Sequence, residues 1–189
     1  IDCAILSRHP LLVRSFSVPG FDRGILAGRV TIDGEPFYVL VNHWKSRYGG
    51  GEEKRMACAK KVVEIVTQWI PDYEGKTTGV VIMGDLNDEP HDASVRYLRQ
   101  NGLIDTLENV RDDKRWTIPY YDRSARKVLY QGFDHIYINP AMKTAGPLRW
   151  VRSTVVQPSV MMRERNINGK DYVWPNDDYS THIGYSDHL

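Results

Sequence analysis

A strand-like apolar run at residues 79–83 is followed at once by acidic and amide side chains. The sequence there reads Gly84-Asp85-Leu86-Asn87. If the extended geometry continues, side chains two residues apart project to the same side, so Asp85 and Asn87 would lie together. A carboxylate beside a carboxamide suits a phosphate and a metal ion, because the amide donates hydrogen bonds and the carboxylate binds metal or orients water. Asp and Asn also favour turns, so these residues alone predict a polar turn equally well.

Three further polar clusters each lie at one end of a strand-like run. They are Asn42-His43, Asp134-His135 and Asp187-His188. One such cluster is weak evidence, because a single His or Asp at a strand end is more often a cap or a surface residue. Polar clusters at strand ends are nevertheless where sheet-based enzymes gather their sites. Four clusters of residue types that bind metal or move protons therefore indicate one shared chemical site.

Hydrophobic patterning predicts the strands that must position these clusters. Residues 24–32 and 36–41 flank an Asp-Gly pair, Asp33-Gly34, and predict a β-hairpin. Residues 111–127 are polar and aromatic and indicate a loop. Strands are also expected over residues 2–6, 79–83, 128–130, 133–138 and 148–156, with a surface excursion or hairpin over 159–185 around Asn168-Gly169.

Two amphipathic segments predict helices. Residues 52–70 carry apolar side chains near helical spacing, and Pro71 ends the segment. A second helix is expected over 91–100, with residues 101–102 (Asn-Gly) as its C-terminal cap. Strands outnumber helices and hairpins mix with helical crossovers, which predicts an α/β (α+β) fold with mixed sheets and helices outside.

Composition sets the outer bounds. The chain has 189 residues, of which 41% are apolar, and lacks an evident linker, so we expect a single domain over residues 1–189. The net charge of +1 makes no strong electrostatic case for nucleic acid or membrane, although a local basic patch is compatible with it. Cys3 and Cys58 predict two buried thiols and leave the redox compartment open. No apolar run reaches membrane-spanning length. We expect a soluble protein, with a secreted or periplasmic bacterial location as one alternative.

The ordered set of motifs resembles the endonuclease/exonuclease/phosphatase superfamily, which includes pancreatic-type deoxyribonuclease and abasic-site endonucleases. The resemblance implies a four-layer α/β sandwich, with two mixed β-sheets packed face to face and helices outside. It also implies metal-dependent hydrolysis of phosphate esters, with Mg²⁺ as the expected ion and Mn²⁺ as an alternative. The motifs that carry it are His43-Trp44-Lys45-Ser46, Gly84-Asp85-Leu86-Asn87-Asp88, Phe133-Asp134-His135-Ile136 and Ser186-Asp187-His188.

The resemblance also assigns roles to single residues. It implies that His188 activates the attacking water or stabilises the reacting phosphate, and that Asp134 orients this histidine. An imidazole titrates near neutral pH and a carboxylate partner raises its basicity, which agrees with these roles. Asp187 and Asp85 are the implied metal-site carboxylates. Asp85 and Asn87 are also implied to position the nucleophile and contact the scissile phosphate.

Two further phosphate contacts follow from the same resemblance. His43 is the implied second histidine, bonding a phosphate oxygen, and Arg23 is the implied phosphate-binding arginine, which would bind through a bidentate contact. An exposed, salt-bridging Arg23 is the alternative. The family's principal metal-binding glutamate and an accompanying asparagine lie in its first strands, which would precede residue 1, as would any carboxylate partner of His43. We therefore expect this chain to be part of a longer protein and to bind metal weakly by itself.

The motifs separate substrates poorly, because the family acts on DNA, RNA, inositol phosphates and sphingomyelin. Residues 132–136 lack the Trp-Cys-Asp-Arg pattern of inositol polyphosphate phosphatases, and the motifs around His43 and Asp85 are similar to bacterial nuclease-like members. The first hypothesis is a phosphodiesterase or nuclease with a nucleic-acid substrate. A phosphatase or phosphodiesterase for a lipid, inositol or sugar phosphate is the alternative, and a non-catalytic binding module is the third.

Basic and aromatic side chains near residue 50 bear on this choice. A basic rim for a phosphate backbone is one interpretation of Lys45, Arg47, Lys54 and Arg55, and a solvated helix face is the other for the last two. Trp44 and Tyr48 would either stack on a base or pack in the protein.

Overall fold

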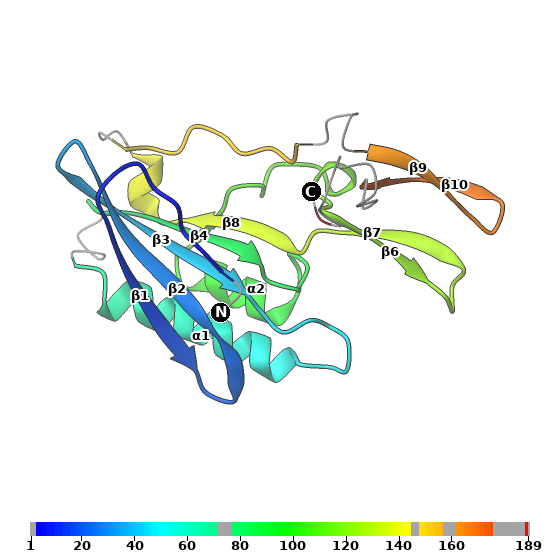
Figure 1. Ribbon diagram of the computed structural model, residues 1–189, viewed down its shortest axis with the longest axis horizontal. Helices are drawn as coiled ribbons and strands as arrows, with labels where there is room; N and C mark the ends of the chain where they lie inside the picture. Colours follow the sequence, from blue (N-terminus) through cyan, green and yellow to red (C-terminus); the bar gives the residue numbers. More distant parts are fainter. Residues whose placement is uncertain (1–2, 72–76, 145–147, 157–161, 176–187, 189) are drawn as a thin grey trace. The chain divides into compact units, whose positions relative to one another are not determined.

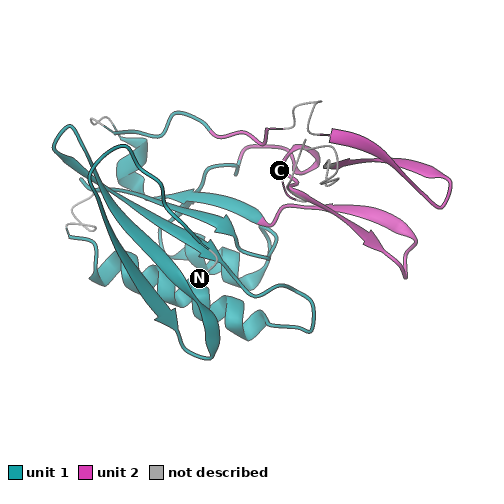
Figure 2. Cartoon of the chain, in the orientation of Figure 1, with its two compact units in different colours: residues 1–108, 134–152 teal, residues 109–133, 153–189 magenta. Residues whose placement is uncertain are grey.

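The computed structural model describes residues 3–71, 77–144, 148–156, 162–175 and 188. The chain divides into two compact units, coloured separately in Figure 2. The first comprises residues 1–108 and 134–152, and the second comprises 109–133 and 153–189. The single domain expected from the sequence stays a prediction.

A six-stranded mixed sheet forms the first unit, in the order β1-β2-β3-β4-β8-β5 (Figure 1). Neighbours β3 and β4 are parallel, because helix α1 crosses over between them, and the other pairs are antiparallel. The predicted α/β class with a mixed sheet is confirmed. The strands are β1 (Leu11–Val18), β2 (Phe21–Ile32), β3 (Glu35–His43), β4 (Gly79–Asp85), β5 (Ile104–Asp105) and β8 (Asp134–Ile138).

The predicted hairpin joins β2 to β3. Asp33 and Gly34 have φ angles of 51° and 87°, the left-handed pair that a tight hairpin turn of matching twist requires. Ile32 pairs with Glu35 directly across this turn. The turn thereby sets the register of β3, which ends at His43.

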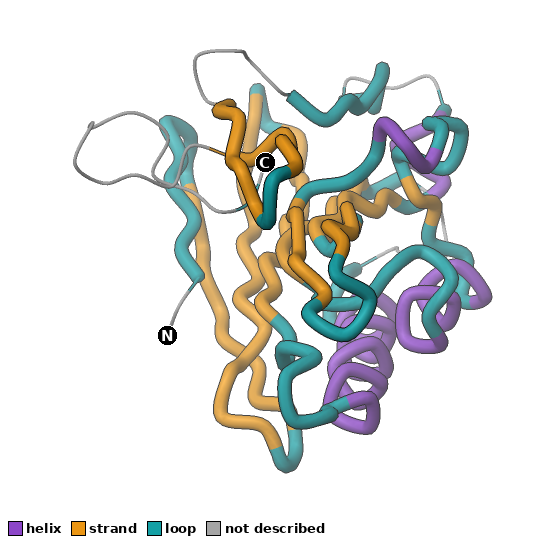
Figure 3. The backbone as a smooth tube through the Cα atoms, turned by 90° about the vertical axis from the view of Figure 1, so that its right-hand side faces the viewer, coloured by secondary structure: helices purple, strands orange, loops and turns teal. Residues whose placement is uncertain are grey.

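Helices α1 (Glu52–Gln68) and α2 (Ala93–Gln100) lie on one side of the sheet (Figure 3). Their boundaries differ from the predicted ones by two residues, at the end of α1 and the start of α2. The predicted cap of α2 is confirmed, since Gly102 has a φ of 83° and the Leu103 N–H bonds the Leu98 carbonyl at 3.2 Å. The buried residues of α1 are Arg55, Cys58, Ala59, Val62, Ile65 and Val66.

The two faces of the sheet carry different side chains. The helices cover a face built from alternate strand residues, including Leu40, Ile82 and Tyr137, all fully buried. Because side chains alternate along a strand, the residues at the strand ends, His43, Asp85 and Asp134, fall on the opposite face. A smaller cluster on that face packs Val81, Ile138 and Met142 together, the last from the 3-10 helix η2 (Pro140–Lys143).

Three sequence predictions about strands are wrong. Residues 3–6 and 148–156 form no strand, because β propensity needs a neighbouring strand to pair with. The Trp150 N–H instead bonds the Met142 carbonyl at 2.8 Å. Residues 111–127 are not all loop, since they contain the 3-10 helix η1 (Asp112–Lys114) and strand β6 (Ile118–Asp122). Hydrophobic patterning did not predict β6, because this five-residue strand lies within a mostly polar segment.

Two hairpins build the second unit. Strand β6 pairs with β7 (Lys127–Gln131), and β9 (Met162–Ile167) pairs with β10 (Lys170–Pro175). The hairpin expected around Asn168-Gly169 is confirmed, with φ angles of 53° and 80° at the turn. Tyrosine hydroxyls join the hairpins: Tyr130 donates to the Val173 carbonyl at 3.2 Å, and Asn168 donates to the Tyr121 hydroxyl.

No helix in the part of the chain that the structure describes is both long and apolar enough to cross a membrane.

Candidate active site

Strand register places three of the predicted site residues in one row. In the parallel pair, His43 at the end of β3 lies opposite Asp85 at the end of β4. In the antiparallel pair, Asp85 lies opposite Asp134 at the start of β8. Residues paired directly across neighbouring strands share a face of the sheet. Three clusters that are far apart in sequence therefore meet at one edge of the sheet.

The groups in this row are close enough to share a ligand. His43 Nε2 lies 3.7 Å from Asp85 Oδ2, and an oxygen of Asp85 lies within 4.8 Å of one of Asp134. All three side chains are half-buried. Two carboxylates this close repel each other, and a divalent cation relieves that repulsion while taking oxygen ligands. The donor set of Asp85 and Asp134 therefore fits a hard divalent ion such as Mg²⁺.

Asp85 and Asn87 also meet, but for a reason other than the one predicted. Strand β4 ends at Asp85, and Asn87 has a left-handed φ of 53°, so extended geometry does not continue between them. The Asn87 backbone N–H donates to Asp85 Oδ1 and its Nδ2 donates to Oδ2, both at 2.8 Å. The same Nδ2 donates to the Trp44 carbonyl at 3.2 Å. Both amide hydrogens of Asn87 thus hold local structure, and a phosphate contact would require one bond to exchange.

The Trp44 carbonyl connects Arg23 to this group. Arg23 Nη1 donates to that carbonyl at 3.2 Å, beside the bond from Asn87. The Trp44 N–H in turn donates to the Asp85 carbonyl at 2.9 Å, which extends the β3–β4 ladder by one bond. Arg23 is half-buried and bonds a residue that adjoins the row, and its role as a phosphate-binding arginine stays a prediction.

Gly84 allows the strands to approach closely where the site begins. Its φ is 130°, and a Cβ built there would lie 1.9 Å from the Asn42 carbonyl oxygen. The Asn42 side chain, 2% exposed, donates to the Met83 carbonyl at 3.3 Å and accepts from Trp44 Nε1 at 3.0 Å. A side chain at residue 84 would push β3 and β4 apart and with them His43 and Asp85.

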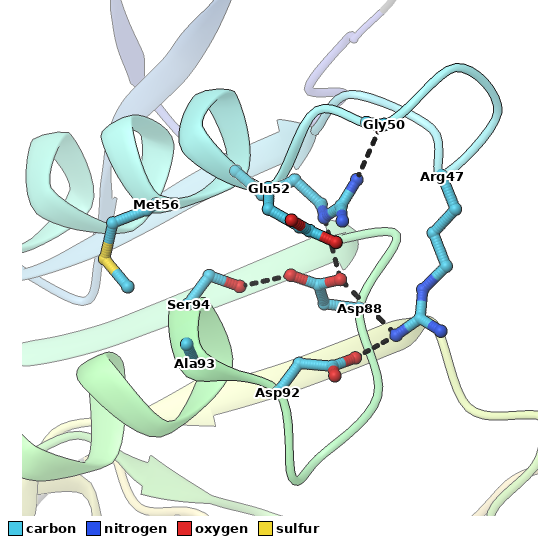
Figure 4. A pocket seen from close by; sticks show the side chains of 9 residues that line it. Arg47, Gly50, Glu52, Met56, Asp88, Asp92, Ala93 and Ser94 are labelled. Carbon is cyan, nitrogen blue, oxygen red and sulfur yellow. Dashed lines mark hydrogen bonds and ion pairs between the residues drawn. The ribbon is translucent and has the colours of Figure 1, made fainter.

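Asp88, the residue after Asn87, lines a polar pocket of about 360 Å³, which we call the arginine pocket (Figure 4). Asp88 occupies its centre, with Oδ1 at 2.7 Å from Arg55 Nε and Oδ2 accepting from the Ser94 hydroxyl at 2.6 Å. His135 Nε2 lies 2.8 Å from the Asp88 carbonyl. The lining residues are Arg47, Gly50, Glu52, Arg55, Met56, Asp88, Asp92, Ala93 and Ser94.

Arg47 links this pocket directly to Asn87. Its Nε donates to the Asn87 carbonyl at 3.2 Å, and its Nη2 pairs with Asp88 at 3.4 Å and with Asp92. Two arginines and the Asp88 carboxylate thereby clamp residues 87–92 onto the loop before α1. Such fixed partners keep a left-handed asparagine in one conformation.

Arg55 differs from both alternatives that the sequence suggested, the basic rim and the solvated helix face, and Trp44 packs in the core, which was one of its two alternatives. Arg55 is 3% exposed and Trp44 is 1% exposed, so neither a basic rim containing Arg55 nor a stacking surface at Trp44 exists. Lys45 turns its ammonium onto the Tyr48 carbonyl at 2.9 Å. A signal for Arg55 was present, because residues 55, 58, 59, 62, 65 and 66 form one helical stripe, and the last five are core residues.

The last two predicted site residues are Asp187 and His188. Asp187 lies outside the described residues, and His188 is described within the second unit as half-buried. Their roles as metal ligand and base stay predictions.

Comparisons with known structures show the fold. The structure of D. rerio TDP2 complexed with single-strand DNA product is 20% identical, with a TM-score of 0.59 over 94% of this chain and 64% of that one. Sphingomyelinase C from Streptomyces griseocarneus is 18% identical, with a TM-score of 0.57 over 96% and 63%. The human Nocturnin catalytic domain with bound sulfate is 18% identical, with a TM-score of 0.53 over 70% and 49%.

This chain spans less than two thirds of each of these structures. A search of curated protein sequences gives no match. The model of the Endonuclease/Exonuclease/phosphatase family matches residues 14–189, which includes the row at the ends of β3, β4 and β8. The chain therefore belongs to the endonuclease/exonuclease/phosphatase family.

Proposed function

We propose that the protein is a metal-dependent phosphodiesterase of nuclease type that cleaves DNA or RNA. The observation that carries this proposal is the row of His43, Asp85 and Asp134 on three adjacent strands, with Asn87 bonded to Asp85. Membership of the family supports a phosphate-ester substrate. The row and the family together support hydrolysis at this edge of the sheet.

A phosphodiester resists attack because it is anionic, so the site must offset negative charge. A divalent ion bound by Asp85 and Asp134, with Asp187 as a further proposed ligand, would supply positive charge and an acidic water. His43, 3.7 Å from Asp85, is proposed to donate to a phosphoryl oxygen, and Arg23 is proposed to do the same from the neighbouring strand. His188 is proposed as the base that takes a proton from the attacking water.

Plasmid nicking tests this proposal. The protein should convert supercoiled DNA to open circles with Mg²⁺ or Mn²⁺ and should stop when EDTA is added. Asp85→Asn should abolish nicking, because it removes a proposed metal-binding charge while it keeps the size of the side chain. Arg96→Gln, an exposed change on α2, serves as the matched control. No cleavage of DNA or RNA with either ion would overturn the nuclease assignment.

A phosphate substrate panel separates the alternatives within the same chemistry. It should contain bis(4-nitrophenyl) phosphate, an inositol phosphate, a sugar phosphate and sphingomyelin. Turnover of the diester together with nucleic acid supports the proposal, whereas turnover of a monoester or a lipid alone transfers the activity to that substrate. Metal-independent binding without any turnover would support the non-catalytic alternative.

A further inference from the structure

We infer that the β9–β10 hairpin of the second unit carries a binding surface for single-stranded nucleic acid. This inference rests on the proposed nuclease function and deepens it, because it names the residues that would hold the substrate strand. The surface combines one face of the hairpin with Arg126 at the tip of the β6–β7 hairpin. All of these residues belong to the second unit.

Strand register sorts the charges of the hairpin onto its two faces. Residues paired across the hairpin share a face, so the pairs 163/174, 165/172 and 167/170 lie on one side, and the pairs 164/173 and 166/171 lie on the other. Both carboxylates of the two strands, Glu164 and Asp171, lie on this second side. The first side, which we call the cationic hairpin face, carries Arg163, Arg165, Ile167, Lys170, Tyr172 and Trp174.

The cationic hairpin face interleaves aromatic rings with positive charge. The Arg165 guanidinium lies over the Trp174 ring, 4.8 Å from its centroid, and Tyr172 lies between Lys170 and Trp174 along β10. Arg165 and Lys170 are exposed, and Tyr172 is half-buried. A strand of nucleic acid presents phosphates for the cations and unstacked bases for the rings. This face therefore offers cations to the phosphates and aromatic rings to the bases of one strand.

A hollow of about 530 Å³ lies against this face. It is lined by Arg126, Ile167, Asn168, Lys170 and Tyr172. Among the residues that the structure describes, no carboxylate lines it, whereas Glu52, Asp88 and Asp92 offset the two arginines of the arginine pocket. Its two cations, Arg126 and Lys170, therefore meet no carboxylate among the described lining residues, and its size is in the range of sites that hold one small ligand group.

The ends of both hairpins favour nucleic acid over a membrane surface. The turn of β6–β7 reads Arg123-Ser124-Ala125-Arg126, and that of β9–β10 is Asn168-Gly169. Insertion into a bilayer requires large apolar side chains on the inserted surface. Neither turn contains one, and Ile167, the aliphatic side chain of the cationic hairpin face, is half-buried.

Fluorescence anisotropy with a fluorescein-labelled single-stranded 20-mer tests the inference, in EDTA to prevent cleavage. Arg165→Glu and Lys170→Glu should each raise Kd by about tenfold or more and lower the slope of log Kd against log salt by about one. Tyr172→Leu should raise Kd at least about fivefold through lost stacking, while Tyr172→Phe keeps the wild-type Kd. Circular dichroism checks that each variant is folded.

Two control variants isolate the face. Lys60→Glu makes the same charge change on an exposed position of α1, and Glu164→Gln changes the opposite face of the same hairpin. Both should bind within about twofold of wild type. Wild-type affinity in Arg165→Glu and Lys170→Glu overturns the inference, as does binding to phosphatidylserine vesicles in place of the oligonucleotide.

Hydrolysis of bis(4-nitrophenyl) phosphate separates this inference from the proposed function. If the small diester is cleaved but the hairpin variants bind the oligonucleotide with the wild-type Kd, the proposed binding surface is wrong and the catalytic proposal stands. If binding follows the hairpin variants but neither the diester nor nucleic acid is cleaved, the surface stands and the nuclease proposal fails.

Discussion

Asn87 holds both oxygens of Asp85, one with its backbone N–H and one with its side-chain amide, each at 2.8 Å. Asp85 is paired in register with His43 on one side and with Asp134 on the other. The orientation of the central carboxylate of the row therefore depends on a residue that lies beyond the end of the strand.

Asn87→Gly isolates this relationship. Glycine adopts the left-handed φ of 53° without strain, so the change removes the amide and keeps the backbone turn. We expect kcat on a small diester to fall by about 10² or more, with a smaller change in KM, because Asp85 loses one of its fixed donors. Steady-state kinetics measure kcat and KM, and thermal unfolding checks that the variant is folded. Unchanged kcat in a folded variant would show that Asn87 does not act through Asp85.

The Asp88–Arg55 pair should dominate the stability of the site. Both side chains are nearly inaccessible, at 4% and 3% exposure, and lie 2.7 Å apart. Removing one partner leaves a buried charge, so Arg55→Met and Asp88→Asn should each lower the free energy of unfolding by about 3–5 kcal/mol. Lys61→Ala, which breaks the pair with Glu64 at the surface of α1, should cost less than about 1 kcal/mol. Urea unfolding measures the free energy of unfolding of these variants. An equal loss in the buried-pair variants and in Lys61→Ala would contradict a buried, tightly coupled pair.

Gly84→Ala tests the close approach of β3 and β4. Both Gly84 and Gly49 have positive φ angles, 130° and 72°, but only at Gly84 would a Cβ meet other atoms, the Asn42 carbonyl oxygen at 1.9 Å. Gly49→Ala should cost about 1 kcal/mol, the backbone term alone. Gly84→Ala should cost more than about 4 kcal/mol or prevent folding. Comparable expression and melting temperatures in the two variants would refute the steric argument.

Cys58 should make the stability of the fold sensitive to alkaline pH. Cys58 lies on the buried side of α1, and this burial raises the pKa of its thiol from 9.0 to about 12. Between these values the unfolded chain loses the proton and the folded chain keeps it. The free energy of unfolding therefore falls with rising pH above about 9, by about 1.4 kcal/mol per pH unit from this group, and is unaffected below.

Urea unfolding at pH 7 to 11 under reducing conditions measures this slope, and Cys58→Ala provides the control because it removes the titrating group. The slope of the wild type should exceed that of the variant only above about pH 9. In the native protein at pH 8, Cys58 should also resist alkylation until denaturant is added. Rapid modification without denaturant would contradict the burial.

Local sequence signals predicted much of the sheet and the helices correctly. Asp33-Gly34 specifies a left-handed turn by its own residue preferences, and the stripe over residues 52–70 specifies which side of α1 is buried. Three of the four polar clusters pointed to the right strand ends, those at His43, Asp85 and Asp134, whereas the cluster at Asp187-His188 stays a prediction. Because Arg55 is charged, hydrophobic patterning did not predict that it lies on the buried stripe of α1.

The identity of the chemical groups was determined by the sequence alone: the carboxylates, imidazoles and amide of the four clusters, their order along the chain, and the family that this order indicates. Only the tertiary structure decided which of them meet. Register between β3, β4 and β8 places His43, Asp85 and Asp134 side by side. The physical reason is that strand pairing and ion pairs such as Asp88–Arg55 join residues tens of positions apart, and their free energy depends on geometry that no local residue preference encodes.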